Sequence, residues 1–146
     1  MRPIQEKLLA LDRIDIAGRV NEEMMVYVRE AIILKTTEGS PPLRIFITSP
    51  GGSANFGITI YDTLKYYKGH KTAVVIGAAE SAAATILQAC DLRTITPNAT
   101  VLIHNAKFSD IDFDDIHDDE RNEAFRKQVR RSHFRKIEIY AKRTGR

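Results

Sequence analysis

Three short segments carry groups that could together cleave an acyl bond. They are residues 49–52, with the sequence Ser-Pro-Gly-Gly, Ser81 in an alanine-rich stretch, and His104 at the end of an apolar run. A serine hydroxyl can act as a nucleophile, an imidazole can take its proton, and backbone amides can stabilise the oxyanion that forms. The amides of Gly51 and Ala82 are the expected donors. The combination predicts a serine peptidase.

Each of these residues also has an ordinary structural interpretation. A serine that opens a helix is often only an N-cap, and a lone histidine at a strand end is often structural. Ser-Pro-Gly-Gly is a common turn sequence. The order of the three segments along the chain, with two of them at strand-to-helix junctions, favours the catalytic interpretation.

The elements that must position these residues follow from the hydrophobic pattern. The expected strands are 13–17, 43–48, 72–77, 93–96 and 100–103, and the expected helices are 22–37, 53–67, 81–90 and 112–143. Apolar strands separated by helices predict an α/β fold with a mostly parallel sheet covered by helices on both faces. In such sheets, functional groups collect where strands end and helices begin, because the first helical amides have no internal partner.

Composition sets limits that agree with this fold class. The 146 residues, 43% of them hydrophobic, suffice for a single domain spanning 1–146. A net charge of +3 does not indicate nucleic acid, and the basic residues of the last helix fit a solvated face. A single cysteine fits a reducing compartment, so a cytoplasmic protein is expected, and no apolar run is long enough to cross a membrane. No metal or organic cofactor is expected.

Four segments closely resemble the Clp protease proteolytic subunit family. They are residues 46–52, 57–63, 77–84 and 97–104, in the same order and with nearly the same spacing. The resemblance implies a crotonase-like α/β fold whose long C-terminal helix, 112–143, projects as a handle. It also implies that Ser81 is the nucleophile, His104 the general base, and the amides of Gly51 and Ala82 the oxyanion donors.

The same resemblance implies a self-compartmentalised endopeptidase. Subunits of this family form seven-membered rings stacked in pairs. A partner ATPase of the AAA+ class feeds unfolded polypeptide into the enclosed chamber. We therefore expect a homo-oligomer that acts on peptides or unfolded proteins.

The chain departs from the family pattern at the third member of the triad. The family's aspartate falls beyond Arg146, which indicates a truncated chain or a divergent C-terminus. Acidic residues after His104 could orient the imidazole, although stabilising the start of the following helix is their simpler role. These residues are Asp110, Asp112, Asp114, Asp115, Asp118 and Asp119.

Three further departures leave other functions open. Glu80 stands where the family has a small residue, the segment 105–111 lacks the family's glycine, and the chain before Leu8 is short. Glutamates serve as acid and base in crotonase-type acyl-CoA enzymes, which is one alternative. A catalytically inactive scaffold or regulatory paralogue is another. The pair of Ser81 and His104 favours the peptidase.

Overall fold

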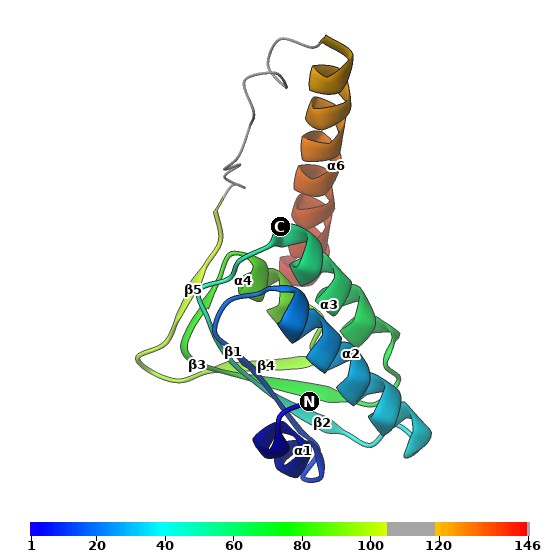
Figure 1. Cartoon of the computed structure of the whole chain (residues 1–146). Helices are drawn as coiled ribbons and strands as arrows, with labels where there is room; N and C mark the ends of the chain where they lie inside the picture. Colours follow the sequence, from blue (N-terminus) through cyan, green and yellow to red (C-terminus); the bar gives the residue numbers. More distant parts are fainter. Residues whose placement is uncertain (105–118, 146) are drawn as a thin grey trace. The chain divides into compact units, whose positions relative to one another are not determined.

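The computed structural model describes residues 1–104 and 119–145, which belong to two compact units, 1–103 and 104–146 (Figure 1). The strands of the first unit are β1 (Arg13–Ala17), β2 (Leu43–Ser49), β3 (Lys71–Glu80), β4 (Leu92–Ile95) and β5 (Thr100–Leu102). Its helices are α1 (Pro3–Leu9), α2 (Glu22–Thr37), α3 (Ala54–Tyr66) and α4 (Ala82–Leu87). The predicted alternation of strands and helices is confirmed, and α1 is an addition to it.

The strands form one parallel sheet in the order β1-β2-β3-β4, with β5 paired to the far end of β3. A bulge explains this arrangement, because Ile47 pairs with Val75 but Ser49 pairs with Ala79, so β3 gains extra residues there. Before the bulge β3 pairs with β4, and after it β3 pairs with β5. The two expected strands around Pro97 are therefore present, but each pairs with β3 rather than with the other.

The core lies on one face of the sheet. Alternate strand residues are fully buried there: Ile14, Ile16, Ile45, Ile47, Ala73 and Val75. Helices α2 and α3 run side by side over this face (Figure 1). Each isoleucine buried in this way contributes about 1.5–3 kcal/mol.

The opposite face of the sheet is more open. Along β2, Arg44 is exposed and Phe46 is half-buried, and the Arg13 guanidinium lies 3.9 Å from the centre of the Phe46 ring. In the described part of the chain the sheet is thus buried mainly on one side. Cover on both faces was expected, and the alternation of polar residues with the isoleucines of β2 shows that the second face is covered less completely than the first.

Two helices begin directly after the loops that leave the sheet. Asn21 accepts a hydrogen bond from the backbone N–H of Met24 (3.0 Å), and Ser53 accepts one from Phe56 (3.4 Å). These caps satisfy amides of the first helical turn and confirm where α2 and α3 were predicted to start. They bring two helix N-termini to the edge of the sheet at which the parallel strands end.

Most of the described residues of the second unit form a long helix, α6 (Asp119–Thr144). It confirms most of the helix predicted over 112–143, of which residues 112–118 lie outside the described part. Lys142 and Arg143 occupy its last turn, where cations interact favourably with the helix dipole. None of the described helices combines the length and apolar character needed to span a bilayer.

Candidate active site

Ser81 occupies the turn between β3 and α4 in a conformation that is unusual for a serine. Its φ is 53° and its ψ is −117°, and its side chain makes no capping hydrogen bond to the helix. The left-handed region costs a non-glycine residue about 1–2 kcal/mol. The capping role considered for Ser81 is therefore wrong. A strained serine at a sharp strand-to-helix turn is typical of an exposed nucleophile.

Backbone hydrogen bonds on both sides hold this turn in place. The Ser81 N–H donates to the carbonyl of Leu102 in β5 (2.8 Å), and the Thr85 N–H donates to the Ser81 carbonyl (3.2 Å). The first residues of α4 are buried alanines, and a Cβ added to Gly57 of α3 would lie 2.9 Å from the Cβ of Ala82. The close approach of α3 thus leaves room for only a small side chain at Ala82.

Gly51 lies directly against this turn. Its φ is +83°, and an added Cβ would lie 2.5 Å from the Glu80 carbonyl oxygen and 2.8 Å from the Ser81 Cβ. The Ala82 nitrogen would be 3.0 Å from the same added atom. Only glycine fits this contact, because both the space and the backbone conformation exclude a side chain. The structure therefore brings together three of the predicted site residues, Ser81, Ala82 and Gly51.

The amides of the glycine pair differ in their hydrogen bonds. The Gly51 N–H donates to the Ser49 hydroxyl (3.0 Å), and the Gly51 carbonyl accepts from the Val20 N–H (2.8 Å). Because the peptide unit is planar and trans, the N–H of Gly52 points opposite to the Gly51 carbonyl, away from Val20. The amide of Gly52 was not singled out from the sequence, where the two glycines look equivalent.

The remaining predicted residues are Glu80, His104 and the acidic residues that follow His104. Glu80 is partly exposed and makes no salt bridge within the described residues. His104 is exposed and belongs to the second unit, two positions after β5. Its pairing with Ser81 stays a prediction. Asp110, Asp112, Asp114, Asp115 and Asp118 lie outside the described residues, as does the side chain of Asp119, so the third acid also stays a prediction.

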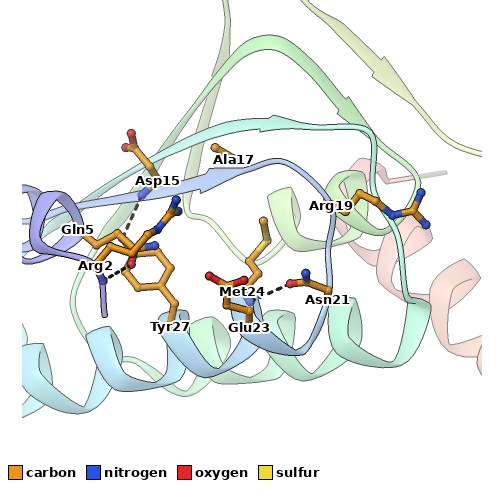
Figure 2. A pocket seen from close by; sticks show the side chains of 9 residues that line it. All are labelled: Arg2, Gln5, Asp15, Ala17, Arg19, Asn21, Glu23, Met24 and Tyr27. Atoms are coloured by element: carbon orange, nitrogen blue, oxygen red, sulfur yellow. Dashed lines mark hydrogen bonds between the residues drawn. The ribbon is translucent and has the colours of Figure 1, made fainter.

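A separate cavity of about 210 Å³ lies at the outer edge of β1 (Figure 2). Its lining residues are Arg2, Gln5, Asp15, Ala17, Arg19, Asn21, Glu23, Met24 and Tyr27. Several of these have structural partners, since Asp15 pairs with Arg13 (2.6 Å) and its N–H donates to the Tyr27 hydroxyl (3.4 Å). Burial raises the pKa of Tyr27. The cavity includes none of the predicted catalytic residues.

Comparison with known proteins identifies the family. A family model described as Clp protease matches residues 1–146. The chain belongs to the Clp protease family. It is 31% identical over 150 residues to the ATP-dependent Clp protease proteolytic subunit of Pleurastrum terricola, covering 97% of this chain and 68% of the relative. It is 33% identical to proteolytic subunit 2 of Treponema denticola, covering 69% of this chain.

The fold agrees with that of a solved Clp structure. A mutant of ClpP1 from Listeria monocytogenes superposes with a TM-score of 0.83 at 28% identity, covering 98% of this chain and 78% of that one. The predicted ClpP-type α/β fold is thereby confirmed. The chain spans 52% of the length of the Treponema Clp subunit and 49% of that of a subunit from Prochlorococcus marinus, so it represents about half of those relatives.

Proposed function

We propose that this chain is the proteolytic subunit of a Clp-type serine endopeptidase, with Ser81 as nucleophile and His104 as general base. One observation carries the proposal: a strained Ser81, whose hydroxyl caps no helix, lies against Gly51 and precedes the amide of Ala82. Membership of the Clp protease family supports the same chemistry.

The proposed reaction is acyl transfer followed by hydrolysis. His104 takes the proton of the Ser81 hydroxyl, and the Ser81 oxygen attacks the carbonyl carbon of the peptide bond. The tetrahedral intermediate collapses when His104 donates the proton to the departing amine. Water, activated by the same imidazole, then releases the acyl group from Ser81.

Backbone amides stabilise the negative oxygen of that intermediate. Ala82 is the first residue of α4, so its N–H has no acceptor within the helix and is available to a ligand. The glycine pair supplies the second donor. Gly51 is the donor that the family resemblance implies, but its N–H is bonded to Ser49, whereas Gly52 directs its N–H away from Val20. Of the two, the Gly52 amide is therefore better placed.

The substrates and partners follow from the family. The relatives from Pleurastrum and Treponema are named proteolytic subunits of ATP-dependent Clp proteases. For this chain we propose peptide or unfolded-protein substrates, assembly into rings or double rings, and delivery of substrate by an AAA+ ATPase in the cytoplasm. Neither an acyl-CoA enzyme nor an inactive paralogue is favoured by these similarities.

The activity is tested by hydrolysis of short fluorogenic peptides, which need no ATPase. The unchanged protein should cleave them, and Ser81→Ala and His104→Ala should each lower kcat by roughly a thousandfold or more. Ser53→Ala is the matched control, because Ser53 also precedes a helix but does cap it, and this variant should stay active. Binding of a CoA thioester without peptide cleavage would support the acyl-CoA alternative. An assembled protein with neither property would indicate the inactive paralogue.

A further inference from the structure

We propose that Ser49 is a positioning residue that aims the oxyanion-stabilising amide of the glycine loop. The inference rests on the proposed function and extends it to a residue that does not touch the substrate. It makes Gly52, rather than Gly51, the donor on this loop. It also accounts for a buried hydroxyl that the reaction itself does not use.

The hydroxyl of Ser49 is placed where it can fix the loop. The residue is 1% exposed, and its Oγ accepts the hydrogen bond from the Gly51 N–H at 3.0 Å. Its backbone pairs with Ala79, at the point where β2 and β3 resume pairing after the bulge. The hydroxyl thus anchors Gly51 to the end of β2, beside the strand β3 that leads to Ser81.

Both polar groups of Gly51 are then satisfied from opposite sides. Ser49 holds its N–H, and the Val20 N–H holds its carbonyl at 2.8 Å. A third bond, from the Ser53 N–H to the Val20 carbonyl (2.9 Å), fixes the far side of Gly52. The peptide plane between Gly51 and Gly52 therefore has little freedom to rotate, and the direction of the Gly52 N–H is set before substrate arrives.

Loss of the Ser49 hydroxyl would leave the Gly51 N–H buried without its acceptor. The loop would relax to satisfy that group, and the Gly52 amide would turn with it. An oxyanion donor acts on the transition state more than on the bound substrate, so the loss should fall on kcat rather than on KM. This split separates a positioning role from a simple contribution to stability.

The test compares Ser49→Ala with a neighbouring control in the peptide-cleavage assay. We expect Ser49→Ala to lower kcat by about 10- to 100-fold, with KM changed by less than about threefold. Affinity for a peptide boronate, whose adduct with Ser81 places a negative oxygen in the oxyanion site, should fall by a similar factor. Ser49→Thr keeps the hydroxyl and should recover a measurable part of both losses.

Thr48→Val is the matched control. Thr48 is the preceding residue, and its hydroxyl donates to the carbonyl of Ile76 at 2.7 Å, so the variant loses a hydrogen bond of similar kind that does not reach Gly51. It should keep kcat and boronate affinity within about twofold of the unchanged protein. Circular dichroism establishes that each variant is folded before its kinetics are compared.

Three results would overturn the inference. An increase in kcat for Ser49→Ala would mean that Ser49 blocks Gly51 and that the Gly51 amide is the donor. An unchanged kcat and boronate affinity would mean that the hydroxyl has no role in positioning. Equal losses in Ser49→Ala and Thr48→Val would indicate a general effect on the sheet. If the unchanged protein cleaves no peptide and Ser81 binds no boronate, the proposed function itself fails.

Discussion

The contact between Gly51 and Ser81 joins two residues that both have a positive φ. Ser81 has a φ of 53° without being glycine, and Gly51 has a φ of 83°. The Ser81 conformation is unfavourable for a residue with a side chain, whereas glycine adopts a positive φ readily. Their hydrogen bonds and the lack of space between them keep both in place, so the site is built by the backbone before any side chain contributes.

Gly51→Ala should therefore be strongly damaging. The new Cβ would meet the Glu80 carbonyl and the Ser81 Cβ in addition to the strain at positive φ, and we expect the free energy of unfolding to fall by about 3 kcal/mol. Gly18→Ala is the control, because Gly18 has a φ of 88° but nothing within 4 Å of the added atom. Its loss should be about 1–2 kcal/mol. Equal losses of unfolding free energy in the two variants, measured by urea unfolding, would contradict the close contact between Gly51 and Ser81.

At the scale of secondary-structure elements, the start of α4 depends on how closely α3 crosses it. Gly57 and Ala82 provide the space for this crossing, since an added Cβ on Gly57 would lie 2.9 Å from that of Ala82. We expect the distance between the two helices to determine the position of α4, and therefore of Ser81 at its start. A substitution in α3 should thus displace the candidate nucleophile.

Gly57→Ala tests this coupling. Within an unobstructed helix the change would stabilise by about 0.5–1 kcal/mol, but here overpacking against Ala82 should give a net loss of about 1–2 kcal/mol and lower peptidase activity. Adding Ala82→Gly removes the clashing methyl group and should restore part of both. A Gly57→Ala protein that melts at a higher temperature would show that the helices do not cross this closely.

A buried lysine at the start of β3 connects the end of α3 with the loop before β4. Lys71 is 4% exposed, and its ammonium donates to the carbonyls of Tyr67 (3.3 Å) and Gly69 (2.9 Å) and pairs with Asp91 (3.1 Å). Burial raises the pKa of Asp91, but the hydrogen bonds and charge of Lys71 outweigh it, and the pKa lies below its ordinary value of 3.8.

This lowered pKa predicts acid sensitivity. Asp91 stabilises the fold above the unfolded-state pKa, and the stabilisation is lost as pH falls through the folded-state pKa. Stability of the unchanged protein should therefore decline below about pH 4. The decline should be shallower in Asp91→Asn, which carries no titrating group there. The melting temperatures of both proteins, measured by thermal unfolding between pH 2 and 6, test this prediction. Parallel curves of melting temperature against pH would contradict it.

At the scale of the whole molecule, apolar residues remain exposed on the two strands β4 and β5, which both pair with β3. Leu92 and Ile95 of β4 are each 52% exposed, and Val101 and Leu102 of β5 are 41% and 48% exposed. Exposed apolar surface of this kind is common at protein interfaces. It fits the proposed assembly of a family whose curated relatives are subunits.

The proposed assembly predicts a particle several times heavier than the 16.5 kDa chain. Light scattering after size-exclusion chromatography should find it at micromolar concentration. Ile95→Glu, which places a charge on the exposed strand, should shift the population toward smaller species. If the protein without substitutions stays monomeric at every concentration, this result would contradict the proposed ring.

The sequence predicted the fold well where periodicity and local signals agree. The strand at 13–17 and the helix beginning at 22 lie where they were expected, and the helix expected from 53 begins one residue later, with Ser53 as its cap. The bulge in β3 could not be predicted, because it arises from pairing with residues far along the chain. The same limit applies to the direction of the Gly52 amide, which depends on the contacts of this loop with Val20. The bond from the Gly51 N–H to Ser49 is local, but the sequence does not show that the Ser49 hydroxyl is buried.

The central claim is that Ser81 is an activated nucleophile, and covalent labelling tests it most directly. A fluorophosphonate probe should modify the folded protein once per chain, peptide mapping should place the label on Ser81, and Ser81→Ala should abolish it. The capping residue Ser53 should stay unlabelled. A folded, unchanged protein in which Ser81 does not react, or a label that persists in Ser81→Ala, would contradict the account.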